Sequence, residues 1–185
     1  VFTINDFFSE YTLTKIINKF GQADLITSQN VLAHVDNLRE TFSNIHKLLK
    51  TNGFFIFEIG YFRSVLELGC FDTIYHEHLD YHHAAPLVRY LSSKGFDVLN
   101  LEVNPVQGGS LRLLLKKTGN GNISRQAQVF LNDEKKSVLN DKKYLQKWSS
   151  KIFKICRVLE DVTRKLLDEN VLFYAYGSPT KAILL

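Results

Sequence analysis

The chain has 185 residues, of which 45% are hydrophobic and 23% charged, a balance typical of a globular protein with one substantial core. Its net charge of +4 suits a small anionic substrate as well as nucleic acid, but its aromatic residues lie in apolar runs such as 53–57, which favours a core role over base stacking. Two widely spaced cysteines indicate no disulfide framework, and no apolar run reaches the roughly 18 residues of a membrane span. We therefore expect a cytoplasmic protein that binds neither nucleic acid nor a membrane.

Short apolar runs alternate with amphipathic stretches, which predicts an α/β fold with a mainly parallel sheet covered on both faces. In the first half we expect a strand over 1–4, a helix over 12–20, a buried strand over 23–28, a helix that starts at Asp36 or Asn37 and stops at Asn52-Gly53, and a strand over 54–59. In the second half we expect a helix over 84–94, an antiparallel pair of strands over 96–103 and 110–117, a long helix over 141–168 and a strand over 171–177.

The densest group of titratable side chains lies between Tyr75 and His83, where four of the six histidines fall within eight positions. Imidazole, carboxylate and phenol groups transfer protons near neutral pH, so this segment is a candidate for acid–base catalysis. His and Glu are also metal ligands, although a helical pair of the His-Glu-x-x-His type would need a histidine where the chain has Asp80. A polar loop whose histidines only hydrogen-bond to the backbone is a third interpretation.

Other candidate residues follow predicted strands. His34 comes shortly after the polar end of a predicted strand, and ligands of open α/β sheets bind outside the carboxyl ends of the strands. A histidine capped by Asp36 at the start of a helix is the alternative. Asp6, Phe7 and Phe8 have the chemistry to hydrogen-bond to and stack on an adenine ring, but a simple turn explains them equally well.

Glycine-containing turns are candidates for binding anions. The run from Gly108 to Arg112 offers backbone N–H groups beside an arginine, which suits a phosphate or a carboxylate, although a plain hairpin turn is an equal alternative. The run from Tyr176 to Lys181 is similar to a phosphate-cradling turn but lacks the spacing of a P-loop. Neither turn identifies a ligand by itself.

Several motifs share one order along the chain: Asp6-Phe-Phe-Ser9, Asn30-Val-Leu-Ala-His34, Phe57-Glu58, Phe71-Asp-Thr-Ile-Tyr-His-Glu-His78, Gly108-Gly-Ser-Leu-Arg112 and Tyr176-Gly-Ser-Pro-Thr-Lys181. Together they resemble the S-adenosylmethionine-dependent sugar C-methyltransferases, of the type that methylates C3 of a 4-keto-deoxysugar nucleotide, over nearly the whole chain. The Tyr-His-Glu-His run is the most specific of them. Ile59-Gly60 and Ser178-Pro179-Thr180 depart from the usual Pro and Ala-Pro-Ala of that family, which bears on the identity of the substrate.

The resemblance implies a fold and a division into domains. Residues 1–118 would be the second half of a Rossmann-like class I methyltransferase domain, residues 119–170 a helical connector and residues 171–185 the start of a C-terminal α/β domain. Members of the family carry zinc in a small domain that precedes these parts, so no metal site is expected here. Because the chain has no methionine and lacks the glycine-rich turn that contacts the cofactor, we expect it to be a fragment.

The resemblance also implies roles for individual residues. His78 would be the general base that removes a proton next to the ketone, Glu77 its orienting partner or an alternative base, and Tyr75 and His34 the hydrogen-bond donors to the enolate oxygen. The cofactor S-adenosylmethionine would contact Asp6, Phe7, Phe8, Gln29 and Asn30. The nucleotide-sugar substrate would contact Glu58, Ser110, Arg112, Tyr176 and Lys181. The alternatives are a non-catalytic remnant of such an enzyme and a metal-dependent hydrolase, and the sequence predicts no oligomeric state.

Overall fold

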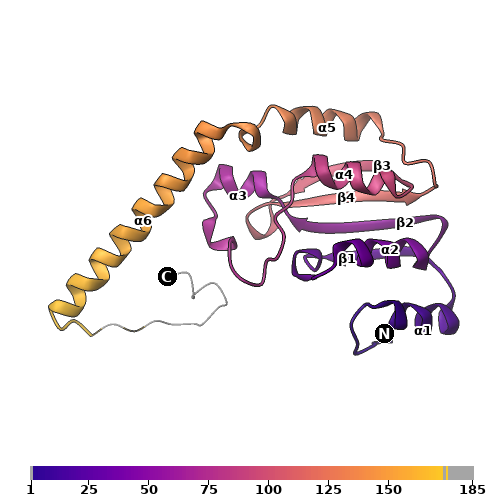
Figure 1. The fold of residues 1–185 in the computed structure, drawn as a ribbon, viewed down its shortest axis with the longest axis horizontal. Coiled ribbons are helices and arrows are strands. Elements are labelled where there is room, and N and C mark those ends of the chain that lie inside the picture. The colour runs from indigo at the N-terminus through magenta and orange to yellow at the C-terminus, as the bar shows by residue number, and fades with distance from the viewer. Residues whose placement is uncertain (1, 173, 175–185) are drawn as a thin grey trace.

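A computed structural model describes residues 2–172 and 174, which form an open four-stranded sheet with helices packed on it (Figure 1). With η for a 3₁₀ helix, the elements are α1 (Glu10–Phe20), β1 (Ala23–Gln29), η1 (Leu32–His34), α2 (Leu38–Leu48), β2 (Leu49–Gly60), α3 (Phe62–Leu68), η2 (Phe71–Thr73), α4 (Ala84–Ser93), β3 (Phe96–Asn104), η3 (Val106–Gly108), β4 (Ser110–Lys117), α5 (Arg125–Lys135), η4 (Val138–Asn140) and α6 (Lys142–Asp168). This alternation confirms the predicted α/β fold class.

The sheet has the strand order β1-β2-β4-β3. β1 and β2 run parallel, whereas β4 is antiparallel to both of its neighbours, β2 and β3. The predicted antiparallel pair is therefore confirmed, but the prediction of a mainly parallel sheet is wrong for the described strands. The reason is the short turn over 105–109, which reverses the chain after β3 and brings β4 back beside β2.

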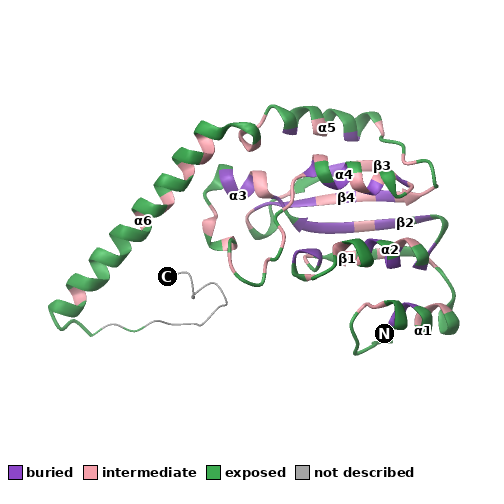
Figure 2. Ribbon diagram, viewed as in Figure 1, coloured by how far each residue is buried: buried purple, intermediate pink, exposed green. Residues whose placement is uncertain are grey.

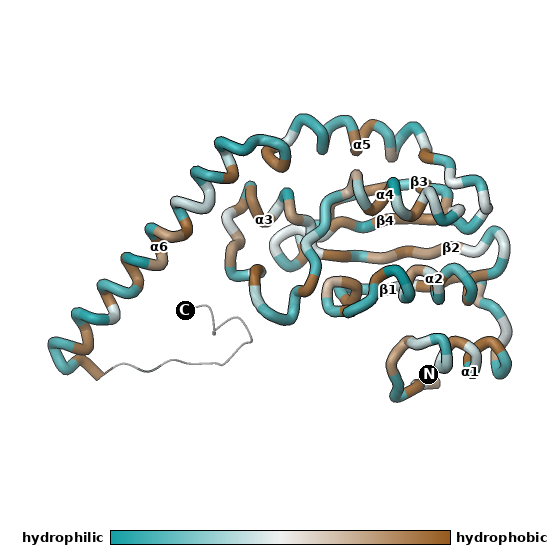
Figure 3. The backbone as a smooth tube through the Cα atoms, in the orientation of Figure 1, coloured by the Kyte–Doolittle hydropathy of each residue, from teal (hydrophilic) through white to brown (hydrophobic). Residues whose placement is uncertain are grey.

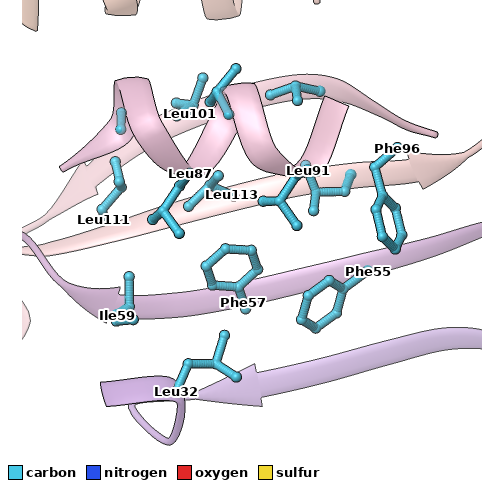
Figure 4. Packing of buried hydrophobic residues seen from close by; sticks show 14 of the residues in the cluster. Leu32, Phe55, Phe57, Ile59, Leu87, Leu91, Phe96, Leu101, Leu111 and Leu113 are labelled. Carbon is cyan, nitrogen blue, oxygen red and sulfur yellow. The ribbon is translucent and has the colours of Figure 1, made fainter. Parts of the chain in front are cut away.

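The hydrophobic core lies on one face of the sheet, against α2 and α4. Figure 4 shows the side chains of α4 packed against those of the strands. Alternate residues of β2 and β4 point into it, and Phe57, Ile59, Leu111 and Leu113 are at most 1% exposed. The rings of Phe55 and Phe57 stack with their centroids 5.0 Å apart. Burial of each such side chain contributes roughly 1.5–3 kcal/mol, so this layer holds the strands in register.

β1 is largely exposed, although the sequence predicts a buried strand. Leu25 of β1 is 53% exposed and Phe54 of β2 is 38% exposed, both on the face opposite to the core. Within the described sheet β1 has a neighbour on one side only, and the core helices pack on the other face. The prediction of a sheet covered on both faces is therefore wrong for the described part of the chain.

The strands predicted at the two ends of the chain are not found among the described residues. Residues 2–4 form no strand, and Val1 lies outside the described part. Val171, Leu172 and Tyr174 likewise show no strand, and the other residues of the range 171–177 lie outside the described part. A strand needs a neighbour for its backbone hydrogen bonds, and these described residues pair with none.

α2 starts where the sequence predicts but ends earlier. The side-chain oxygen of Asn37 accepts from a backbone N–H of the first turn at 3.1 Å, which confirms Asn37 as the N-cap. The helix ends at Leu48 and not at Asn52-Gly53, because Leu49 already belongs to β2 and is fully buried. The carbonyl oxygen of Leu49 accepts from Lys117 Nζ at 2.8 Å, which ties the helix end to β4.

The helices after the sheet are only partly as predicted. α5 is additional to the predicted elements, and it packs on β3 and buries Ala127 and Glu134. The first part of the predicted connector over 119–170 therefore packs against the sheet domain. α6 confirms the predicted long helix. It extends away from the sheet (Figure 1), has no buried residue (Figure 2), and carries apolar residues among polar ones along its length (Figure 3).

The turn between β3 and β4 needs glycine where it meets α3. Gly109 has a φ of 106°, which L side chains rarely adopt, and a Cβ at this position would overlap Ser64 of α3. At Gly108, which has a φ of 80°, a Cβ would lie 3.3 Å from Cys70 Sγ. The backbone N–H of Tyr61 donates to the Gly109 carbonyl oxygen at 3.1 Å. This packing supports the hairpin interpretation of the glycine pair.

Gly109→Ala is expected to destabilise the chain more than Gly119→Ala. Both changes replace a glycine of positive φ, but a Cβ at Gly119, which has a φ of 87°, meets nothing within 4 Å. The difference between the two variants isolates the overlap with Ser64, for which we expect about 1–3 kcal/mol of unfolding free energy. Chemical denaturation followed by circular dichroism measures it, and equal unfolding free energies would contradict the tight packing of this turn on α3.

Candidate active site

A cavity of about 400 Å³ opens at the carboxyl ends of β1 and β2, where ligands of open α/β sheets bind. Asn30, which follows β1, and Gly60, which ends β2, both line it. The histidine-rich segment forms another side, so that the lining includes His34, Tyr75, His78, Asp80, Tyr81 and His82. We call this space the edge cavity. It brings together three of the four residues predicted to be catalytic.

His78 is held in one tautomer by the backbone. Its Nδ1 lies 2.8 Å from the carbonyl oxygen of Thr73, and a carbonyl oxygen only accepts, so Nδ1 carries the hydrogen. In the neutral ring, Nε2 then has a lone pair and lies 3.3 Å from the hydroxyl of Tyr75, which donates to it. His78 therefore presents a basic nitrogen next to a phenol in the edge cavity.

His34 is also held by a backbone carbonyl. Its Nδ1 lies 2.8 Å from the carbonyl oxygen of Glu77, and its ring centroid is 4.9 Å from that of His78. The backbone N–H of Leu79 donates to the Ala33 carbonyl oxygen at 2.8 Å. These two hydrogen bonds dock the histidine-rich loop on η1, so residues far apart in the sequence meet at the end of β1.

Two phenols lie beside His78. The ring centroid of Tyr75 is 4.4 Å from that of His78, and the ring centroid of Tyr81 is 6.3 Å from it. The hydroxyl of Tyr81 donates to the Tyr75 carbonyl oxygen at 3.5 Å. Burial raises the pKa of Tyr81 above its ordinary value, so this hydroxyl remains a donor at neutral pH.

Asp80 and His82 line the edge cavity, although the sequence predicts no role for either. The Nε2 atom of His82 is buried and has no hydrogen-bond partner among the described residues. Burial lowers the pKa of His82, which keeps its imidazole neutral at neutral pH. The dense titratable segment points to this neighbourhood, but periodicity does not tell which of its side chains turn inward.

Glu77 and His76 do not reach the edge cavity with their side chains. Both residues are exposed, and neither belongs to the lining. Glu77 contributes its backbone carbonyl, which holds His34. Among the described residues, Glu77 therefore contacts His34 through its main chain and not through its carboxylate.

The predicted cofactor residues are only partly at the edge cavity. Asn30 lines it, with a φ of 52° and its backbone N–H donating to the Glu58 carbonyl oxygen at 2.8 Å. Gln29 is exposed at the end of β1. The Phe7 ring is 90% exposed beside Asp6, whose carboxylate accepts from the Phe7 N–H at 2.9 Å. An exposed aromatic face next to a carboxylate fits the chemistry of an adenine.

Phe8, the remaining predicted cofactor residue, packs against the hydrophobic core. Its carbonyl oxygen accepts from the buried side chain of Asn44 on α2 at 3.5 Å. This anchors the segment before α1 to α2, so Phe8 fixes the place of Asp6 and Phe7 in the chain.

Glu58 and Arg112, predicted to contact the substrate, form an ion pair within the sheet. Glu58 is 3% exposed, and its Oε2 lies 2.8 Å from Arg112 Nη2. Arg112 Nη1 donates to Glu102 at 2.9 Å, so the three residues form a row across β2, β4 and β3. Ser110 is buried and donates its hydroxyl to the Val106 carbonyl oxygen at 3.1 Å. Tyr176 and Lys181 lie outside the described residues.

The described part of the chain has neither a group of side chains that would hold a metal ion nor a helix that would span a membrane. Among residues 2–172 and 174, no three His, Cys, Asp or Glu side chains gather in a way that would hold a metal ion. No helix in this part is long and apolar enough to cross a membrane.

Two family models match the chain. Residues 2–101 match the methyltransferase domain, and residues 105–185 match the C-methyltransferase C-terminal domain. The chain is 24% identical over 168 residues to the C-methyltransferase NovU of Streptomyces niveus, a match that covers 90% of this chain and 40% of NovU. It therefore spans less than half of the length of this curated relative.

Solved structures resemble the chain only in part. They include the N-methyltransferase NodS of Bradyrhizobium japonicum with S-adenosyl-L-homocysteine, at 15% identity, a TM-score of 0.38 and coverage of 52% of this chain and 46% of NodS. A putative hemolysin of Lactococcus lactis has 14% identity, a TM-score of 0.41 and coverage of 63% and 58%. Likenesses this low add nothing to the assignment, which rests on the family models. The chain belongs to the methyltransferase-domain family, in the group that continues into the C-methyltransferase C-terminal domain.

Proposed function

We propose that this chain is part of an S-adenosylmethionine-dependent C-methyltransferase that removes a proton from the carbon next to a ketone of a nucleotide-linked deoxysugar. One observation carries the proposal: Nε2 of His78, which has the lone pair when the ring is neutral, lies 3.3 Å from the hydroxyl of Tyr75 at the edge cavity. Membership of the family supports methyl transfer. A base next to a hydrogen-bond donor supports enolate formation, which needs both groups at one carbonyl.

In the proposed step, His78 Nε2 takes the proton, the C–H bonding pair becomes the double bond of the enolate, and the ketone oxygen gains the negative charge. The Thr73 carbonyl oxygen continues to accept the hydrogen bond from Nδ1 and so stabilises the imidazolium that forms. The Tyr75 hydroxyl turns from Nε2 to the enolate oxygen. Because His34 already donates its Nδ1 hydrogen to Glu77, it donates to the enolate only when its Nε2 is protonated.

The residues proposed to hold the cofactor lie before α1 and after β1. S-adenosylmethionine, when bound, supplies the electrophilic methyl group that the enolate carbon attacks. We assign its adenine to Asp6 and the exposed ring of Phe7, with Phe8 as the anchor of this segment. Asn30 in the edge cavity and the exposed Gln29 are assigned to the part of the cofactor nearest the acceptor.

The proposed acceptor is a 4-keto-6-deoxysugar nucleotide, methylated at C3. Two carboxylates already offset the charge of Arg112, so we assign the phosphates chiefly to Tyr176 and Lys181. Glu58 and Ser110 then contribute to substrate binding indirectly. Glu58 holds the side chain of Arg112, and Ser110 holds the turn after β3. The proposed setting is the cytoplasm, whose reducing conditions fit the unpaired thiols of Cys70 and Cys156.

The base assignment is tested by hydrogen–deuterium exchange without cofactor. The chain is mixed with TDP-4-keto-6-deoxyglucose in D₂O, and loss of the C3 proton signal is followed by NMR. His78→Ala is expected to lower the catalysed exchange rate about 10²–10⁴-fold, the usual contribution of a general base. His76→Ala is the matched control, because His76 is exposed and outside the cavity lining, and its rate should stay within about twofold. Equal rates for His78→Ala and the unmodified chain would contradict the proposal, as would no catalysed exchange by the unmodified chain.

The role of the Tyr75 hydroxyl is tested by removing it alone. Tyr75→Phe keeps the ring against His78 but removes the donor to the enolate, so exchange at saturating substrate is expected to fall about 10²-fold with little change in KM. Tyr81→Phe is the control, since the Tyr81 hydroxyl donates to a backbone carbonyl. A loss in Tyr81→Phe as large as in Tyr75→Phe would refute the assignment.

A further inference from the structure

Glu134 is a buried carboxylate that the proposed reaction does not use. It lies on α5, is 2% exposed, and accepts hydrogen bonds from the backbone N–H groups of Ala84 at 2.6 Å and Ala85 at 2.8 Å. The hydroxyl of Tyr61 donates to it at 2.8 Å, and Nδ1 of His83 lies 3.5 Å away. The carboxylate therefore joins α5 to the start of α4 and to the segment after β2.

The charge of Glu134 suits this place. Burial acts to raise its pKa, but hydrogen bonds from His83, Ala84, Ala85 and Tyr61 lower the pKa below its ordinary value, so the group is ionised at neutral pH. The amino end of a helix carries partial positive charge and unpaired N–H groups, which a carboxylate satisfies.

The segments that Glu134 holds form one wall of the edge cavity. Tyr61 and His82 pair as an isolated parallel bridge, and the backbone N–H of Phe62 donates to the His82 carbonyl oxygen at 2.9 Å. Gly60, Phe62 and His82 all line the edge cavity. Glu134 thus contacts the neighbours of three lining residues without lining the cavity itself.

A second contact from α5 acts on the same wall. Asp133, next to Glu134, accepts from Arg63 Nη1 at 2.5 Å, and Arg63 lies on α3 beside the lining residue Phe62. The Tyr144 hydroxyl of α6 donates to the Leu66 carbonyl oxygen of α3 at 3.1 Å. α5 and α6 therefore contact the segments of the cavity wall through several side chains, and among these side chains Glu134 is buried.

We propose that Glu134 is a positioning residue for the reaction: it fixes the wall formed by Gly60, Phe62 and His82 chiefly by holding the first two residues of α4 through their N–H groups, with the hydrogen bond from Tyr61 as a secondary contact. This inference rests on the proposed function only in taking the edge cavity as the place where the acceptor binds. It assigns no proton transfer and no substrate contact to Glu134.

Two substitutions separate positioning from simple stabilisation. Each oxygen of Glu134 accepts one helix N–H, so Glu134→Gln places an NH₂ group against one of these donors and releases one end of the wall. Tyr61→Phe removes one hydrogen bond to the same carboxylate but leaves both helix N–H bonds intact, and it is the matched control. Glu134→Asp keeps the charge and serves as the conservative variant.

The experiment measures KM and kcat of the C3–H exchange well below the melting temperature of every variant. We expect Glu134→Gln to raise KM about tenfold or to lower kcat by a similar factor, Tyr61→Phe to stay within about threefold, and Glu134→Asp to recover part of the loss. A Glu134→Gln variant that melts earlier but has unchanged KM and kcat when folded would overturn the proposal. If Glu134→Gln does not fold, the same comparison is made between Glu134→Asp and Tyr61→Phe, and equal kinetic values would overturn it.

An independent signal keeps this test separate from the proposed function. The ¹H–¹⁵N spectrum reports the backbone amides of Gly60, Phe62 and His82 whether or not exchange occurs. We expect Glu134→Gln to shift all three, and Tyr61→Phe to shift them less. Unmoved amides in Glu134→Gln would overturn the positioning role, whereas absent exchange with shifted amides would count against the proposed function alone.

Discussion

Two hydrogen bonds from imidazole rings to backbone carbonyls set the chemistry of the edge cavity. Thr73 and Glu77 supply the carbonyl oxygens, and His78 and His34 donate their Nδ1 hydrogens. A carbonyl oxygen has no hydrogen to give, so each neutral ring is left with a lone pair on Nε2. Were the hydrogens on the other nitrogens, His78 would offer no base to the Tyr75 side of the cavity.

Buried carboxylates and imidazoles have different tasks in this chain. Glu58 and Glu134 are both almost fully buried, and each is matched by several donors, from Arg112 in one case and from α4 and Tyr61 in the other. A buried ionised carboxylate is tolerated only with such partners. The carboxylates therefore link strands and helices to one another, while the neutral imidazoles of His34 and His78 each keep a lone pair on Nε2.

Where the sequence signal is local, it points to residues that meet at the edge cavity. The histidine cluster and the strand-end position of His34 both follow from short segments, and the rule that ligands bind at carboxyl strand ends connects them. Short segments do not predict the role of Glu134, because its burial depends on Tyr61, 73 positions away, and on the start of α4. The sequence of α5 is largely polar, so Glu134 is expected on a face exposed to solvent.

The same distinction applies to the fold. The start of α2 follows from the cap chemistry of Asn37, whereas its end depends on Lys117 reaching over from β4. The resemblance assigns Glu58 and Arg112 to the substrate, and the sequence does not reveal that they pair with each other, since strand register, which places them directly opposite each other, is not visible in a hydrophobic pattern. Long-range pairing is thus what the sequence left open.

The tautomer of His78 is the most direct test of the account. Two-bond ¹H–¹⁵N correlation spectra of the ¹⁵N-histidine-labelled chain distinguish the two ring nitrogens, and a His78→Gln variant assigns the signals. We expect neutral His78 to carry its hydrogen on Nδ1 and to leave Nε2 unprotonated. A hydrogen found on Nε2, with Nδ1 unprotonated, would contradict the hydrogen bond to Thr73 and remove the proposed base from the edge cavity.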